Sequence, residues 1–276
     1  MPVAISEEHR LLSETANDLL RSRDARGASR DLLEAPEETI GDWWTEVVEL
    51  GWLGLHVPEE LGGSGFGLEE LAVLTEEMGR AVAPGPFVPT VIASATINAA
   101  CDTELKQRLV PGLADGSTFA AISLDGSVSL ESGTGPGRTV SGKADAVLGG
   151  GLASVFVLAV GEDVAIVESG DEVSVHVPQN LDPTRRSAQV TFQSAPAIVI
   201  PGARRTLVDM ARLVLSAEAV GMARECTDLA AQYAKEREQF GRPIAMFQAV
   251  KHHCADMAVA TELATGAVWD AARAAA

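Results

Sequence analysis

Apolar residues recur at helical spacing through the first part of the chain. Ser6, followed by Glu7 and Glu8, is suited to cap a helix N-terminus. The apolar residues after it recur at i, i+4, i+7 and i+8, namely Leu12, Ala16, Leu19 and Leu20. Further helical patterns cover residues 38–50, 68–78, 87–100 and 104–114. These patterns predict an N-terminal helical domain over residues 1–116.

The pattern changes after Gly116 to short β-rich runs, separated by clusters of Gly, Asp, Ser and Pro. The runs cover residues 119–124, 139–141, 154–160, 164–167, 173–177, 189–192 and 197–200. Many short strands with frequent turn signals are typical of an antiparallel barrel or sandwich. We therefore expect a central β domain over residues 117–201.

Helical spacing returns at Arg204, and Gly221 on one face of this helix permits another helix to pack closely. A glycine-proline break follows, and Pro243 suits the first turn of the next helix. We expect a C-terminal helical domain over residues 202–276 that contains two long helices. Because two helices alone cannot bury both apolar faces, either sequence beyond Ala276 or a partner should complete the bundle.

The charge balance is strongly acidic, since 21 Lys and Arg against 39 Asp and Glu give a formal net charge of −18. Nucleic acids and anionic membranes are bound by basic surfaces, so we expect neither as a partner. The three cysteines are far apart and in no metal-ligand spacing, which indicates reduced thiols and no metal site. Residues 1–8 lack the regions of a signal peptide, and no apolar run reaches the ~18 residues of a membrane span. We expect a cytoplasmic protein.

The most specific motif is R-E-Q-F-G-R-P-I at residues 237–244, followed by F-Q-A-V-K at residues 247–251. It resembles the segment that holds the FAD pyrophosphate in acyl-CoA dehydrogenases. Three other segments resemble motifs of the same family: G-L-H-V-P-E-E-L-G-G-S-G at 54–65, E-E-M-G-R at 76–80 and L-D-P-T-R at 181–185. The order of helical, β and helical domains also matches, so the resemblance covers nearly the whole chain.

The resemblance implies an α+β multidomain fold and an FAD-dependent oxidoreductase that introduces a 2,3 double bond into an acyl-CoA thioester. In the family a glutamate removes the α-proton while a β-hydride passes to the flavin. The implied partners are an acyl-CoA substrate, an electron-transfer flavoprotein as acceptor, and other homologous subunits. Arg237, Gln239 and Gln248 should donate hydrogen bonds to the cofactor, and Phe240 should pack against it.

Several positions depart from the family pattern. One family position for the base corresponds here to Ala211 and the other lies beyond Ala276, so the sequence identifies no catalytic residue. In the β domain, Ala146 replaces a flavin-packing tryptophan and Leu148 replaces a threonine, while Ser123 keeps a hydroxyl. Loss of so large an aromatic side chain removes on the order of 3–5 kcal/mol of packing.

These departures predict a degenerate subunit, or the leading half of a fused pair, that lends its pyrophosphate-binding segment to an FAD held by a partner. Family members with this division of labour include some that act on steroid side-chain CoA thioesters, so a steroid acyl group is one candidate beside a fatty acid. Two alternatives stay open: a non-catalytic structural partner of a catalytic homologue, and a related flavin oxidase or monooxygenase.

Overall fold

The computed structural model describes residues 6–131 and 138–275. Contacts divide the chain into two compact units: residues 1–24, 68–83 and 215–276 form the first, and residues 25–67 and 84–214 form the second. The three-domain division along the sequence remains a prediction, because each unit combines distant segments. In the described part of the chain, no helix has both the length and the apolar character needed to cross a membrane.

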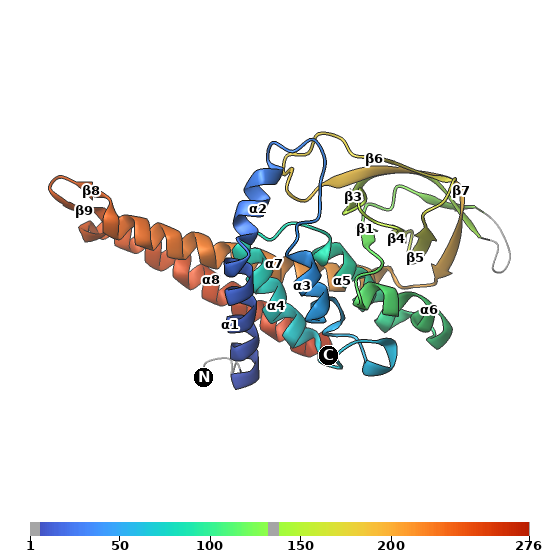
Figure 1. Ribbon diagram of the computed structural model, residues 1–276, viewed down its shortest axis with the longest axis horizontal. Helices are drawn as coiled ribbons and strands as arrows, with labels where there is room; N and C mark the ends of the chain where they lie inside the picture. Colours follow the sequence, from blue (N-terminus) through green and yellow to red (C-terminus); the bar gives the residue numbers. More distant parts are fainter. Residues whose placement is uncertain (1–5, 132–137, 276) are drawn as a thin grey trace. The chain divides into compact units, whose positions relative to one another are not determined.

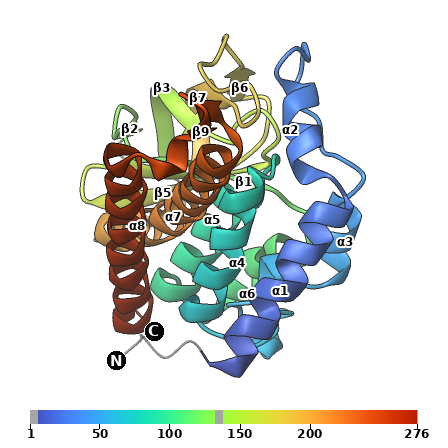
Figure 2. The same ribbon diagram turned by 90° about the vertical axis from the view of Figure 1, so that its left-hand side faces the viewer.

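The first unit is helical. Its α-helices are α1 (Glu7–Ser22), α4 (Leu68–Ala81), residues 215–236 of α7 (Arg204–Glu236), and α8 (Gln248–Ala275). Ser6 caps α1 as predicted: its Oγ accepts the His9 N–H at 3.1 Å, and His9 Nδ1 accepts the Ser6 N–H at 3.4 Å. Helices α1 and α4 lie side by side (Figure 2). Helices α7 and α8 also run together (Figure 1), with Arg224 donating to Thr265 across the pair.

Two glycines bring α4 and α7 into backbone contact. A Cβ on Gly79 would lie 2.1 Å from the carbonyl oxygen of Glu218, and a Cβ on Gly221 would lie 1.9 Å from that of Glu76. Real side chains cannot approach so closely, so only glycine fits at either position. The close helix packing predicted at Gly221 is therefore confirmed.

The E-E-M-G-R segment of α4 ties three helices together. Its polar contacts are Glu77 with Ser13 and Asn17 of α1, Arg80 with Glu225 and Asp228 of α7, and Glu76 with Arg224 of α7. Burial raises the pKa of Glu76, and the charge of Arg224 acts in the opposite direction. Because each polar residue of the motif contacts a neighbouring helix, the motif has a structural role in this chain.

The α-helices of the second unit are α2 (Ala25–Leu32), α3 (Trp44–Glu49), α5 (Phe87–Ala100), α6 (Thr103–Ala114) and residues 204–214 of α7. Helix α5 has the predicted bounds, but the helix predicted over residues 38–50 is wrong in its first half. Arg186 binds the segment before it, donating to the carbonyl oxygens of Ala35 at 2.6 Å and Pro36 at 2.8 Å. These tertiary hydrogen bonds hold the chain in an irregular path just before the predicted helix.

The second unit also contains a closed β-barrel. Its strands are β1 (Ala120–Ser123), β2 (Ser129–Glu131), β3 (Thr139–Leu148), β4 (Val155–Val160), β5 (Asp163–Glu168), β6 (Val173–His176) and β7 (Ser187–Ile200). The sheet order is β2-β3-β1-β4-β5-β7-β6, and an additional β3–β7 pairing closes a ring of five strands. The predicted β fold of this central region is confirmed, with one exception to its antiparallel character, since β1 and β4 are parallel.

Aromatic and β-branched side chains fill the barrel. Phe156 of β4 and Phe192 of β7 meet edge to face, with ring centroids 6.0 Å apart, among buried valines and alanines. The two runs predicted at residues 189–192 and 197–200 are one strand, β7. The polar residues between them suggested a break, but Ala195 and Pro196 still pair with β3.

Candidate functional site

The motif at residues 237–244 forms a small hairpin where α7 and α8 meet (Figure 1). Its strands are β8 (Glu238–Gln239) and β9 (Arg242–Pro243), with Glu238 opposite Pro243 and Gln239 opposite Arg242. The pairing continues by one hydrogen bond, from Ile244 N–H to the Arg237 carbonyl at 2.8 Å. Pro243 caps a short 3₁₀ helix, η3 (Ile244–Met246), and the long helix α8 begins only at Gln248. The prediction that Pro243 lies in the first turn of the next long helix is therefore wrong.

The turn of the hairpin places an aromatic side chain in solvent. Phe240 and Gly241 have φ angles of 54° and 74°. Positive φ at both loop positions suits a two-residue hairpin, but it strains a bulky residue such as phenylalanine. The Phe240 side chain is 91% exposed. The strained backbone and the unburied ring leave the Phe240 side chain available to contact another molecule.

The predicted cofactor-binding residues on this segment supply hydrogen-bond donors. The Arg237 guanidinium forms no ion pair or hydrogen bond with any residue that the structure describes. Gln239 Nε2 donates to the Glu238 carbonyl at 2.8 Å, which leaves its second N–H available. Gln248 is the first residue of α8, where the helix dipole favours anions. This donor set matches the chemistry of a diphosphate.

A second arginine, Arg242, lies on the same hairpin and is not among the residues predicted from the motif. The Arg242 guanidinium carbon lies 4.4 Å from the centroid of the Phe247 ring. The rings of Phe247 and Phe240 meet edge to face with centroids 6.1 Å apart. The stacking of these three side chains orders the tip of the hairpin.

Ser123, the remaining predicted cofactor-binding residue, belongs to the second unit at the end of β1. It is buried, and its hydroxyl has no hydrogen-bond partner of normal geometry among the described residues. The loop after it is closed by Asp125, which accepts from the Ser127 N–H at 3.0 Å and the Ser127 hydroxyl at 2.9 Å. Burial acts to raise the pKa of Asp125, but these hydrogen bonds outweigh it and lower the pKa. The Ser123 hydroxyl also helps to lower the pKa of Asp125, so it faces this carboxylate within the chain.

The positions expected to contact a flavin ring, or to supply a base, carry no suitable groups. Ala146 is exposed on β3, and Leu148 lies opposite Ile122 of β1. Ala211 of α7 is completely buried and has no carboxylate. Glu218 is the next acidic residue along α7. Its backbone packs against Gly79 of α4, so this position has a structural role. The hairpin therefore suits a diphosphate, whereas these positions do not suit an isoalloxazine ring.

The two ends of the chain match models of one protein family. Residues 6–117 match the acyl-CoA dehydrogenase N-terminal domain, and residues 202–276 match the acyl-CoA dehydrogenase C-terminal domain. The acyl-CoA dehydrogenase IpdE2 of Mycobacterium tuberculosis is 32% identical over 270 residues, which cover 97% of this chain and 76% of the relative. This chain belongs to the acyl-CoA dehydrogenase family. The expected family, its oxidoreductase class and its dependence on FAD are thereby confirmed.

Other relatives extend the comparison. Acyl-CoA dehydrogenase FadE34 of Mycobacterium tuberculosis is 39% identical over 91% of this chain, yet the chain spans only 35% of its length. A solved structure described as a Tcur3481-Tcur3483 steroid ACAD variant has a TM-score of 0.91 and 29% identity, covering 99% of this chain and 79% of that one. The fold class predicted from the sequence is confirmed by this similarity.

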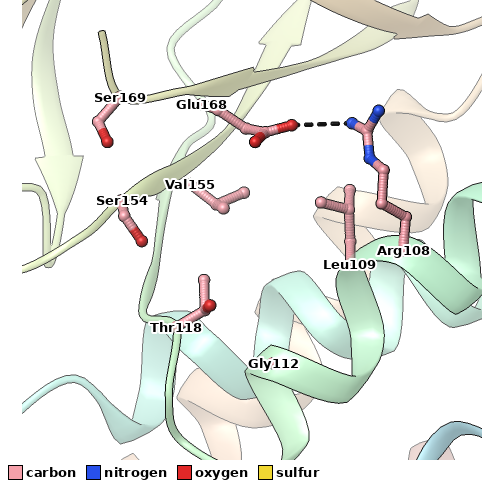
Figure 3. Close-up of a pocket in the computed structure, with 8 residues that line it drawn as sticks. All are labelled: Arg108, Leu109, Gly112, Thr118, Ser154, Val155, Glu168 and Ser169. Atoms are coloured by element: carbon pink, nitrogen blue, oxygen red, sulfur yellow. Dashed lines mark hydrogen bonds and ion pairs between the residues drawn. The ribbon is translucent and has the colours of Figure 1, made fainter.

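The second unit of this acyl-CoA dehydrogenase family member also has a surface cavity of about 340 Å³, shown in Figure 3. It lies among α6, the segment before β1, and strands β4 and β5. Arg108 and Glu168 form an ion pair of 2.8 Å beside the hydroxyls of Thr118, Ser154 and Ser169. None of the five residues predicted to bind the cofactor lines this cavity, so it is distinct from the candidate site.

Proposed function

We propose that this chain is a subunit, or one half, of an FAD-dependent acyl-CoA dehydrogenase that lends its β8–β9 hairpin to an FAD held by a partner. The reaction is the introduction of a 2,3 double bond into an acyl-CoA thioester. The observation that carries this proposal is the exposed hairpin, whose Arg237 guanidinium has no partner among the described residues.

The donors of the hairpin support the phosphate-holding role. Arg237 provides a planar set of N–H groups that fits phosphate oxygens, and Gln239 and Gln248 provide amide N–H groups. Phe240, exposed at the turn, can cover an apolar part of the cofactor or of its pocket. The bound FAD would supply the hydride acceptor, and these residues would fix its diphosphate in position.

The other half of the site is assigned to a homologous partner. Ala146 offers no aromatic surface to a flavin, and Ala211 cannot accept the α-proton. A glutamate of the partner would therefore remove that proton. The similar structure whose description names two polypeptides, Tcur3481-Tcur3483, supports a heteromeric arrangement. An electron-transfer flavoprotein is the proposed electron acceptor.

The test is to purify the complex with its homologous partner and to replace Arg237 by alanine. The flavin content per complex should fall well below that of the wild type, while assembly is retained. Arg205→Ala, which removes an exposed arginine of α7, is the matched control and should retain the flavin. If Arg237→Ala keeps the full flavin content, the chain acts as a structural partner and the proposal is wrong.

Two further measurements define the chemistry. Oxygen consumption during turnover would indicate an oxidase or monooxygenase, whereas reduction of an electron-transfer flavoprotein would indicate a dehydrogenase. Steroid side-chain CoA thioesters are the substrates to compare first with fatty acyl-CoA, because a similar solved structure is described as a steroid ACAD. A higher kcat/KM on the steroid thioester assigns the acyl group to that class.

A further inference from the structure

The register of the β8–β9 hairpin determines which side chains share a face. Residues directly opposite each other in an antiparallel pair point to the same side, and so do residues two apart along a strand. Gln239 pairs with Arg242, so their side chains lie on one face, and Arg237 precedes Gln239 by two residues. Glu238, opposite Pro243, points to the other face. The hairpin thus presents two guanidinium groups and one amide on the same face.

Both arginines keep their charge available on this face. In the described ranges, no carboxylate pairs with either Arg237 or Arg242. Arg242 instead stacks on Phe247, 4.4 Å from the ring centroid, and Phe247 immediately precedes α8. A guanidinium stacked on a ring keeps its N–H edges free for hydrogen bonds in the plane of the group. Side chains alternate between the two faces of a strand, so the neighbouring acid Glu238 points away from the face that carries the two arginines.

A diphosphate bridge carries two negative charges, one on each phosphoryl group. A single guanidinium forms two hydrogen bonds with one phosphate, so it neutralises one of these charges. In a chain of net charge −18, two unpaired arginines on one small hairpin face form a localised positive site. Their number and placement match the charge of a diphosphate.

We propose that Arg242 is a second diphosphate-binding residue, so that Arg237 and Arg242 each neutralise one phosphoryl group of the cofactor. This inference rests on the proposed function of the hairpin. Phe247 is then a positioning residue, since its ring holds the Arg242 guanidinium beside the paired strands β8 and β9. The competing role for Arg242 is purely structural, in which stacking on Phe247 stabilises the hairpin without any ligand contact.

The two roles are separated by replacing Arg242 in the complex with the homologous partner. The complex is stripped of flavin, and the Kd of FAD is measured by titration for the wild type, Arg242→Lys, Arg242→Gln and Arg237→Ala. Riboflavin, which lacks the diphosphate, is titrated in parallel. Loss of one charge-assisted contact should weaken FAD binding about tenfold in Arg242→Gln. Arg242→Lys should recover most of the affinity, and riboflavin should bind equally to all forms.

The outcomes distinguish this inference from the proposed function. If Arg237→Ala weakens FAD binding and Arg242→Gln does not, the second contact is refuted while the proposed function stands. If neither variant changes the Kd of FAD, both are refuted. If Arg242 acts only by ordering the hairpin, its effect passes through Arg237, so Arg242→Gln would cause no further loss of FAD affinity in an Arg237→Ala background. That result would refute the diphosphate contact, whereas a further loss of about tenfold supports it.

Discussion

Gly221 of α7 lies against the carbonyl oxygen of Glu76 on α4, so closely that a Cβ at position 221 would be 1.9 Å from that oxygen. The adjacent contact, Gly79 against the Glu218 carbonyl, repeats the arrangement one turn away. The close approach brings Arg224 within 3.1 Å of the Glu76 carboxylate and Arg80 within 3.1 Å of Glu225. Two glycines therefore make possible the ion pairs that join α4 to α7.

Gly221→Ala should destabilise the chain, because the methyl group forces the two helix backbones apart. Overpacking of this kind costs about 1–3 kcal/mol in the free energy of unfolding. The matched control is Gly266→Ala on α8, where no atom lies within 4 Å of the new Cβ. That change should stabilise the chain by about 0.5–1 kcal/mol, since alanine favours a helix. Urea unfolding of both variants measures the difference, and equal stabilities would contradict the close contact.

Removal of Arg224 should produce a pH-dependent loss of stability. Burial raises the pKa of Glu76, and Arg224→Met would raise it further because the opposing charge is lost. A carboxyl with a raised pKa contributes stability at low pH that is lost as pH rises through its folded pKa. The variant should therefore lose about 1–2 kcal/mol at pH 7 and less at pH 5, since the pair is only partly buried. A loss that is independent of pH would argue that Arg224 acts by packing alone.

His56 should make the second unit sensitive to acid. It is fully buried, and burial lowers its pKa from 6.5 to about 4. Its Nε2–H donates to Ser94 Oγ at 3.0 Å, because the Ser94 hydroxyl itself donates to the Val91 carbonyl. Its Nδ1 has no partner among the described residues, so protonation there would bury an unpaired charge.

The unfolded state thus binds a proton that the folded state excludes between pH 6.5 and about 4. Stability should fall as pH decreases through this window, by on the order of 3 kcal/mol at its lower end. The test compares urea unfolding of the wild type with His56→Leu between pH 7 and pH 4.5. The wild type should show the steeper dependence on pH, and parallel curves would mean that His56 is not the group responsible.

Phe240 should lower the thermal stability of the isolated chain and strengthen its complex with the flavin-holding partner. Its φ of 54° is strained for phenylalanine, whereas asparagine tolerates this conformation. Phe240→Asn should therefore raise the melting temperature of the chain alone, or leave it unchanged, and weaken its complex with the flavin-holding partner. Sedimentation velocity measures the second effect. If the complex is equally stable with asparagine, the exposed ring makes no contact with the partner.

Local patterns predicted the parts of the fold that local forces determine. Helix α5 has the predicted bounds and Ser6 caps α1, because apolar spacing and capping act within one turn. The segment before α3 was not predictable in this way, since Arg186 holds its carbonyls from a position 150 residues away in the sequence. The β3–β7 pairing that closes the barrel also depends on distant strands.

In the candidate site, too, local sequence predicted some residues, whereas others became apparent only from the three-dimensional structure. Arg237, Gln239, Phe240 and Gln248 were predicted from the motif, and the structure places all four in one segment. Arg242 was overlooked because a charged residue beside a turn resembles an ordinary solvated charge. Its pairing with Gln239 and its stacking on Phe247 appear only in three dimensions. In a two-residue hairpin, the side chain opposite Gln239 lies on the same face as Gln239. This rule would have selected Arg242 from the sequence.

If this chain supplies the phosphate-holding part of an FAD site whose reactive part lies in a partner, the chain should hold FAD only in the assembled complex. The most direct measurement is the flavin content of the purified chain, alone and after assembly with its homologous partner, determined by absorbance and protein assay. We expect no bound FAD in the chain alone and stoichiometric FAD in the assembled complex. Stoichiometric FAD in the isolated chain would contradict it.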